Sequence, residues 1–286
     1  MLGDVLAFLV CPHCGADLEL DDRVVSCATG HRYDVARQGY VNLMPGGAHT
    51  GTADTPAMVA AREAFFDAGH FAPLISAVAD EAQRITPAET PGCVIDLGAG
   101  PGRYLAAVLD RLPERVGLAL DLSKHALRRA ARCHPRAGAV ASDVWRALPV
   151  RAGVAALALD VFAPRNGAEI RRVLQPDGAL VTVTPTPDHL REVVPTLGLL
   201  TVDDDKRDRV HRQLAPHLAL QRETAVAFAM TLTADDLDAL VTMGPSAWHV
   251  DRAGLAARIR ALSPPITVTA SVTVAAYGHR GRARDR

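Results

Sequence analysis

The chain has 286 residues, of which 49% are apolar and 22% are charged, a composition that indicates a globular protein with room for one large and one smaller domain. No apolar run approaches the roughly 20 residues that span a bilayer. The first ten residues are too acidic for a secretory signal, so we expect a cytoplasmic protein with no membrane partner. The net charge of −1 gives no chain-wide sign of a nucleic-acid partner.

Three of the five cysteines and one histidine gather near the start of the chain, at Cys11, Cys14, Cys27 and His31. Two residues separate the first pair and three separate the second, a spacing at which each pair reaches one ion from a tight turn. Four protein ligands leave no position for a catalytic water, so the pattern predicts a structural zinc ion. The alternative is a set of buried thiols beside a surface histidine.

The stretch between the two ligand pairs alternates in polarity, which predicts two short strands joined at Asp21 and Asp22. His13 lies inside the first pair, where its geometry competes with Cys14, so we do not expect it to be a ligand. About 45 residues do not fold securely without such a metal. We therefore predict a zinc ribbon domain over residues 1–45.

A Gly-, Pro- and Thr-rich segment near residues 45–56 precedes a stretch with helical apolar spacing at 57–85. The spacing is broken between Gly69 and Pro73, which predicts two helices. We interpret residues 46–90 as a helical linker region.

From residue 93 onward, short apolar runs alternate with segments compatible with helices. Five runs are expected to be strands: 93–100, 115–123, 137–144, 155–162 and 178–185. This alternation predicts an α/β fold with a parallel, Rossmann-like sheet over residues 91–286. Two later runs, 218–230 and 266–277, lack a crossover suited to a parallel unit and are expected to form an antiparallel edge pair.

A glycine-rich loop follows the first of these strands. Asp96 precedes it, and its glycines are Gly98, Gly100 and Gly102. Such glycines let the backbone turn sharply and approach a ligand, while the next helix presents its amino end. The loop therefore predicts a site for a nucleotide-type cofactor.

Two further carboxylates, Asp121 and Asp143, end the next two predicted strands. Carboxylates at successive strand ends gather along the edge of a parallel sheet where ligands bind. We expect Asp121 to accept hydrogen bonds from ribose hydroxyls and Asp143 to accept one from an adenine amino group. For each residue alone, a helix cap or a turn is the simpler interpretation.

The loop and its carboxylates resemble the first motif of class I S-adenosyl-L-methionine (SAM)-dependent methyltransferases, and no phosphate-gripping GK[ST] competes with it. A dinucleotide site remains an alternative. It would better suit a GxGxxG loop that opens the domain, with no carboxylate immediately before the loop.

The whole chain closely resembles the 23S ribosomal RNA guanine-N1-methyltransferases. The motifs that carry the resemblance are the cysteine-histidine ribbon, GHRYDVARQGYVNL (30–43), MVAAREAFFDAGHF (58–71), DLGAGPGRY (96–104), FAPRN (162–166), RVLQPDG (172–178), TPTPDHLREV (184–193) and MGPSAWH (243–249). FAPRN and MGPSAWH are similar to the actinomycete branch that confers resistance to tylosin-type macrolides. The linker GTADTPAM departs from the shorter acidic stretch of many relatives.

The resemblance implies SAM-dependent methylation of guanine N1 in a 23S rRNA hairpin loop near the peptide exit tunnel, by a homodimer. Asp160, at a strand end that faces the acceptor in this fold, is the candidate to accept from guanine N1, and Asn166 is a second candidate catalytic residue. His189 is expected at the cofactor pocket, and Trp248 offers a stacking face. For Asp160 an ordinary strand-end carboxylate, and for Trp248 a core position, remain alternatives.

The charge evidence for RNA is local. Residues 1–44 hold three arginines against six acidic residues, while basic clusters lie at 123–136, at Arg165 with Arg171 and Arg172, and in the tail 278–286. Such clusters are more often solvated faces, yet together they are suited to line a groove for RNA. A methyltransferase acting on an antibiotic scaffold, or a non-catalytic RNA-binding protein, would be the alternatives.

Overall fold

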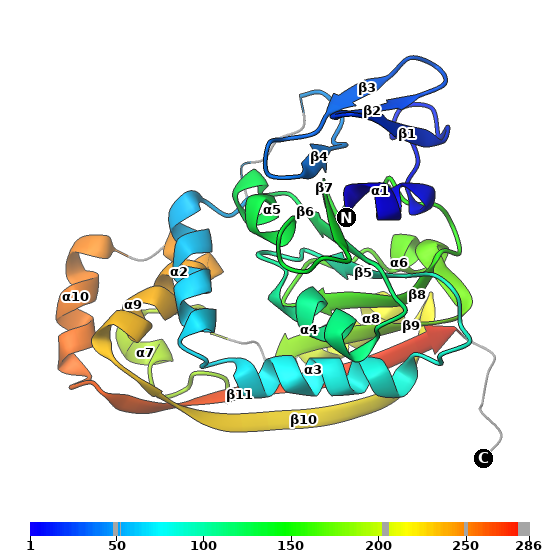
Figure 1. Ribbon diagram of the computed structural model, residues 1–286. Helices are drawn as coiled ribbons and strands as arrows, with labels where there is room; N and C mark the ends of the chain where they lie inside the picture. Colours follow the sequence, from blue (N-terminus) through cyan, green and yellow to red (C-terminus); the bar gives the residue numbers. More distant parts are fainter. Residues whose placement is uncertain (48–50, 52, 202–205, 249–250, 280–286) are drawn as a thin grey trace.

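The structure is a computed structural model that describes the chain except for residues 48–50, 52, 202–205, 249–250 and 280–286. Among the described residues, one mixed sheet of eight strands has the order β10-β11-β9-β8-β5-β6-β7-β4 (Figure 1). The strands are β4 (Tyr40–Asn42), β5 (Cys93–Leu97), β6 (Gly117–Asp121), β7 (Ala137–Ala141), β8 (Ala155–Val161), β9 (Leu174–Pro185), β10 (Leu218–Leu232) and β11 (Ile266–His279).

Neighbouring strands from β9 to β4 run parallel, whereas β11 pairs antiparallel with both β9 and β10. The predicted parallel sheet with an antiparallel edge pair is thus confirmed. The connection from β10 to β11 does contain helices, but they pack at the far end of the long hairpin instead of crossing the sheet (Figure 1). The chain therefore returns antiparallel.

Alternate residues of the strands face two different helix layers. Ile95 and Leu118 share one core with α1 (Leu2–Val5), α6 (Gly167–Val173) and α8 (Lys206–Leu214). Val94 and Ala119 share the other core with α3 (Ala72–Ile85), α4 (Arg103–Arg111) and α5 (Lys124–Ala130). Burial on both faces explains why the central parallel strands β5, β7 and β8 are nearly continuously apolar.

A third apolar cluster lies at the end of the β10–β11 hairpin and includes residues of both strands, such as Met230 and Val268. Its helices are α2 (Pro56–Asp67), α7 (Val194–Leu197), α9 (Ala234–Met243) and α10 (Arg252–Ala261), with the short η2 (Pro245–Trp248) between the last two. The predicted break between α2 and α3 is confirmed, with a positive φ at Gly69. Phe65 of α2 is fully buried in this cluster, so the predicted linker region contributes to a core.

The N-terminal module begins with α1 and η1 (Leu6–Phe8), followed by a small antiparallel sheet, β1 (Leu18–Asp21), β2 (Val24–Cys27) and β3 (Arg32–Asp34). The predicted hairpin turn is present, and Asp22 adopts φ 50° there. The following strand, β4, adds to the main sheet beside β7. The segment 1–45 therefore shares a sheet with the rest of the chain.

Within the described part of the chain, no helix combines the length and apolar character needed to cross a membrane.

Candidate active site and metal centre

The four predicted metal ligands come together in the N-terminal module. Their ligand atoms, from Cys11, Cys14, Cys27 and His31, all lie within 4.8 Å of one another. The Sγ atoms of Cys14 and Cys27 are 3.7 Å apart, and His31 Nδ1 lies 3.4 Å from Cys27 Sγ. Zinc–sulfur bonds of about 2.3 Å place two sulfurs of a tetrahedron about 3.8 Å apart. Spacing and donor types therefore fit a structural zinc ion.

Local structure explains this convergence. The first pair lies in the turn after η1, Cys27 ends β2, and the backbone N–H of Cys27 donates to the carbonyl of His31 across the next turn. The His13 ring stacks on the His31 ring with centroids 4.8 Å apart, and His13 is outside the ligand cluster. His13 therefore contacts a ligand residue without belonging to the cluster, in agreement with its predicted exclusion.

The glycine loop after β5 is packed too closely for side chains. A Cβ atom at Gly98 would lie 2.8 Å from Cβ of Ala163, in the loop after β8, and Gly98 has φ 69°. A Cβ atom at Gly102 would lie 2.7 Å from the Sγ of Cys133. Only glycine fits both the conformation and the space.

Asp121 is oriented by this loop. Its two carboxylate oxygens accept from the backbone N–H groups of Gly100 at 2.8 Å and Ser123 at 2.7 Å. Burial raises the pKa of Asp121, while these two hydrogen bonds oppose the rise. Each carboxylate oxygen has a further lone pair, so the group can still accept hydrogen bonds from a ligand.

Asp96, at the end of β5, is 2% exposed, and its Oδ2 has no hydrogen-bond partner within the described residues. Burial, together with the charges of Asp121 and Asp160, raises the pKa of Asp96 to about 8. Asp121 and Asp160 therefore both lie close enough to Asp96 for their charges to act on it. An orphaned buried acceptor beside a glycine loop fits a bound ligand with N–H donors, as the SAM amino group has.

Asp160, at the end of β8, is fully buried and forms an ion pair of 3.2 Å with Arg165. Burial raises the pKa of Asp160 to about 7, although the positive charge of Arg165 opposes the rise. Neither carboxylate oxygen, nor the Arg165 Nε, has a hydrogen-bond partner among the described residues. The pair is thus poised for additional polar contacts.

Two other predicted residues hold loops in place. Asp143 accepts from the backbone N–H of Trp145 at 3.0 Å and pairs with Arg146 at 3.4 Å. Asn166 caps α6 by accepting from the backbone N–H of Glu169 at 3.3 Å, and its amide donates to the Trp145 carbonyl at 3.1 Å. Both ends of the Asn166 amide are therefore engaged with backbone.

Phe162 is a site candidate that the sequence did not single out. It follows β8 with φ 55°, an unusual conformation for a bulky residue, and its side chain is 42% exposed. Its ring lies 6.1 Å from the ring of His189, whose Nδ1 accepts from the backbone N–H of Ser271 at 3.1 Å. His189, predicted to lie at the cofactor pocket, is therefore next to the exposed ring of Phe162. Phe162 itself is two positions after Asp160 in the chain.

A cavity of about 550 Å³ opens at the ends of β4, β6 and β7, lined by residues that include Asn42, Leu122, Ser123, Ala141 and Trp248. Trp248 is 52% exposed, so it is not a core residue; the last residue of its motif, His249, lies outside the described residues. The volume is within the range of small-molecule sites.

Arg62 is a second residue that the sequence did not single out. It projects from α2, forms an ion pair with Asp54 and donates to the carbonyl of Met243 at 2.6 Å. A Cβ atom at Gly100 would lie 3.4 Å from its Nη1, so the guanidinium borders the glycine loop. Nothing in the helical spacing of α2 distinguishes this arginine from a surface residue.

Comparison with known proteins identifies the same two parts. A family model for a zinc ribbon, described as RlmA, N-terminal, matches residues 9–49. The 23S rRNA (guanine(748)-N(1))-methyltransferase of Streptomyces fradiae is 50% identical over 273 residues, which cover 96% of this chain and 97% of that protein. A protein of Micromonospora griseorubida, provisionally named a 23S rRNA (guanine-N(1)-)-methyltransferase, is 50% identical over 291 residues, with 96% and 98% covered.

The crystal structure of the MccD protein aligns with a TM-score of 0.50 over 71% of this chain and 96% of that chain, at 12% identity, a likeness that concerns the fold alone. Identity of 50% along almost the full length shows the family. The chain thus belongs to the 23S rRNA (guanine-N1)-methyltransferases, SAM-dependent enzymes, and carries a structural zinc ribbon.

Proposed function

We propose that this enzyme methylates N1 of a guanine in a hairpin loop of 23S rRNA near the peptide exit tunnel. The name of the Streptomyces fradiae relative specifies guanine 748, and we propose the equivalent guanine here. The observation that supports this most is the buried Asp160–Arg165 pair, together with the exposed ring of Phe162 two residues after Asp160 in the chain. A guanine needs both a polar contact at its Watson–Crick edge and a flat apolar contact at its face.

We propose that the cofactor binds at the carboxyl edge of the sheet. SAM, when bound, supplies the activated methyl group. We assign its contacts to the Gly98–Gly102 loop, with Asp121 accepting from the ribose hydroxyls, Asp143 from the adenine amino group and Asp96 from the amino group of the methionine part. Two backbone hydrogen bonds already fix the Asp121 carboxylate, so it needs little reorganisation to bind.

At the acceptor, N1 of guanine must lose its proton as the methyl group is transferred. We propose that the carboxylate of Asp160 takes this proton, while Arg165 holds the carboxylate in place. A pKa of about 7 lets Asp160 be ionised in part at neutral pH and still be basic enough to accept a proton. Because the carboxylate is buried, only a base inserted beneath the surface can reach it.

We propose that Phe162 and His189 hold the inserted base by stacking; for His189 this assignment replaces the cofactor contact that the sequence analysis expected. Their rings are 6.1 Å apart and tilted by 33°, and a base between two rings needs centroids about 7 Å apart, so a small rotation admits it. Phe162 combines a positive φ with an exposed ring, and such backbone strain clusters at functional sites. We assign Asn166 a positioning role, because its side-chain amide connects the start of α6 to the loop that contains Trp145.

A hairpin loop is a suitable substrate because N1 of guanine is hidden in a duplex. Extruding a paired base from a duplex costs about a few kcal/mol more than extruding an unpaired loop base. Labelled SAM offered with the rRNA hairpin, with the same strand annealed into a perfect duplex, and with macrolide scaffolds tests the proposal. We expect label in the hairpin only, and a methyl group on guanine N1 by mass spectrometry of the digest. Label in a small molecule alone, or on another atom, would overturn it.

Methylation removes the N1 donor and adds bulk near the tunnel wall, where macrolides bind. We therefore propose that expression raises tolerance to tylosin-type drugs. The proposal places the protein in the cytoplasm with the ribosome and, by the resemblance described above, as a homodimer; size measurement in solution checks the latter.

A further inference from the structure

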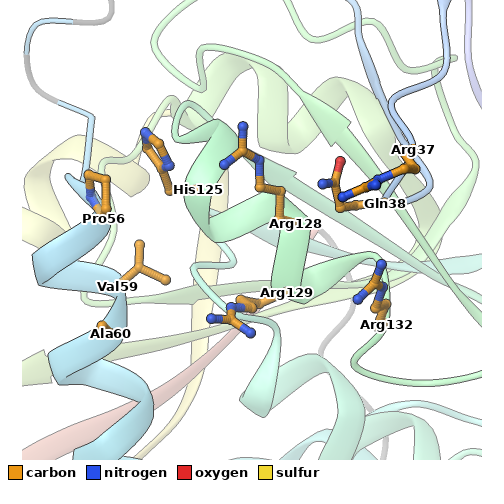
Figure 2. Close-up of a pocket in the computed structure, with 9 residues that line it drawn as sticks. All are labelled: Arg37, Gln38, Pro56, Val59, Ala60, His125, Arg128, Arg129 and Arg132. Atoms are coloured by element: carbon orange, nitrogen blue, oxygen red, sulfur yellow. The ribbon is translucent and has the colours of Figure 1, made fainter.

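A second, strongly basic cavity lies between the zinc ribbon and the methyltransferase domain. It has a volume of about 320 Å³, and its polar lining consists of Arg37, Gln38, His125, Arg128, Arg129 and Arg132. Figure 2 shows Arg37 and Gln38 entering from the ribbon side, and His125 and Arg128 projecting from α5 toward the same space. The cavity therefore combines guanidinium groups from both parts of the chain.

The charges in this cavity are mostly uncompensated. Arg129 pairs with Glu63 of α2 at 3.0 Å, whereas no carboxylate within the described residues pairs with Arg37, Arg128 or Arg132. All four arginines are exposed. Burial, Arg128 and Lys124 lower the pKa of His125, as expected in a field of positive charge. Three free guanidinium groups around one hollow are suited to a multiply charged anion.

The position of the ribbon arginine is fixed by the fold. Arg37 and Gln38 lie in the turn between β3 and β4, which the Gly39 N–H closes by donating to the Ala36 carbonyl at 2.8 Å. β4 then pairs with β7, and the site of a Cβ at Gly39 is 3.8 Å from Cβ of Ala131, so the turn rests against the end of α5. Although acidic residues outnumber arginines in the ribbon, its turn with Arg37 thus lies against α5.

The basic cavity is next to the carboxyl edge of the sheet. It shares the lining residues Pro56 and His125 with the larger cavity described above, which reaches Ser123 and Trp248. A ligand held among the arginines would therefore lie directly beside that edge.

We propose that this cavity binds phosphodiester groups of the substrate RNA and fixes the RNA across the ribbon and the methyltransferase domain. This inference rests on the proposed function and deepens it by naming a surface that contacts the RNA backbone. Planar guanidinium groups match phosphate oxygens in bidentate pairs. The flanking apolar side chains, Pro56, Val59 and Ala60, are too few for an aromatic or peptide anchor. Phosphate contacts set register and orientation and carry no sequence information, so guanine selection stays with the proposed acceptor residues Asp160 and Phe162.

Binding of the rRNA hairpin by the full chain, measured by fluorescence anisotropy over a range of salt, tests this contact. In the Arg128→Ala/Arg132→Ala variant each lost phosphate contact lowers the slope of log affinity against log salt by about 0.7 to 0.9. We therefore expect a slope smaller by about 1.4 to 1.8, and weaker binding most evident at low salt. Arg37→Ala should lower the slope by about half as much.

Two variants serve as matched controls. Arg128→Lys/Arg132→Lys keeps both charges and should restore most of the slope. Arg111→Ala removes an exposed arginine of α4 that pairs with Asp80 at 2.9 Å, outside the cavity, and should bind like the original protein. SAM affinity, measured by calorimetry, should be unchanged in all of them.

The outcomes separate this inference from the proposed function. If the original protein methylates guanine N1 of the hairpin but the double alanine variant keeps its affinity and salt slope, the cavity is not an RNA contact. If the double variant loses SAM affinity while its salt slope is unchanged, the cavity serves the cofactor and the inference is overturned. Failure of the original protein to methylate rRNA at all would contradict the proposed function.

Discussion

At the scale of single residues, the candidate site contains carboxylates in different surroundings, which suit them to the different roles proposed above. Two backbone N–H groups hold Asp121 as an acceptor, whereas Asp160 is fully buried against a single guanidinium. The first arrangement favours binding of hydroxyl donors, and the second favours exchange of a proton. Each task is open to a separate measurement.

Replacing Asp121 by Ala should weaken SAM binding by about 1 to 3 kcal/mol, because the ribose hydroxyls lose charged acceptors and the N–H of Gly100 loses its partner. Calorimetry measures the affinity, and a thermal melt of the same sample separates lost binding from lost folding. The SAM affinity of Asp121→Asn, which keeps one carbonyl acceptor, should lie between that of the original protein and that of Asp121→Ala. An unchanged affinity in the Ala variant would contradict the assignment of the ribose site.

Replacing Asp160 by Asn should lower the methylation rate by about 10²- to 10⁴-fold, because an amide cannot take the N1 proton. SAM affinity should be retained. Asp188→Asn is the matched control, since Asp188 is a solvent-exposed carboxylate that pairs with Arg191. Equal rates for the Asp160 variant and the original protein would contradict the role of base.

The same carboxylate predicts a pH dependence. The ionised form is the one that accepts a proton, and burial raises the pKa of Asp160 to about 7. kcat/KM should therefore fall about tenfold per pH unit below that pKa and level off above it. Single-turnover rates on the hairpin between pH 5.5 and about 9 measure this limb. Asp160→Asn should abolish it, and a limb that persists in the variant would assign the titration to another group.

At the scale of elements, the zinc ribbon is a set of very short strands with few apolar residues of its own. Of the three strands β1, β2 and β3, the longest has four residues. A sheet this small needs a hydrophobic face or packing against another element for its stability. The ligands Cys11, Cys14, Cys27 and His31 connect its turns at one point, so metal binding and folding are coupled there.

Replacing Cys27 by Ser should therefore release zinc, unfold the ribbon and weaken methylation of the hairpin, while SAM binding in the main domain is retained. Elemental analysis of freshly purified protein should give one zinc per chain before the change and much less after it. His13→Ala is the control: His13 stacks on a ligand but is not one, so its zinc content should remain near one. Absence of zinc from the original protein would contradict the metal assignment.

At the scale of the whole molecule, the ribbon and the methyltransferase domain are joined by packing as well as by chain connectivity. β4 extends the main sheet, and the fully buried Val5 of α1 occupies the space above Gly138 in β7. A Cβ atom at Gly138 would lie 2.3 Å from Cγ2 of Val5, so no side chain fits there without displacement. The close contact fixes how the N-terminal segment lies on the sheet.

Replacing Gly138 by Ala should lower the free energy of unfolding by about 1 to 3 kcal/mol through overpacking. Hairpin methylation should fall more than SAM affinity, because the ribbon is displaced while the glycine loop is not. Urea unfolding, calorimetry and a methylation assay measure the three quantities. Val5→Ala combined with Gly138→Ala removes the overlapping methyl group and should recover part of the loss. A double variant less stable than Gly138→Ala alone would refute this steric explanation.

The sequence by itself determined the features that depend on local spacing. Ligand pairs two and three residues apart, apolar runs between helical segments and a glycine loop preceded by Asp96 each report their own local geometry. The parallel sheet, its antiparallel edge and the convergence of the four metal ligands were therefore predictable. The prediction that guanine N1 is the methyl acceptor came from the resemblance of the whole chain to its relatives, because no single residue spacing encodes it.

Only the tertiary structure decided which residues from distant segments meet. Phe162 and His189 are neighbours because the loops that follow β8 and β9 leave the sheet at the same edge. The positive φ of Phe162 has no signature in the amino-acid sequence. Arg37 meets Arg128 and Arg132 because β4 pairs with β7. Sequence spacing describes contacts within an element, whereas contacts between elements depend on how the strands are ordered and how the cores pack.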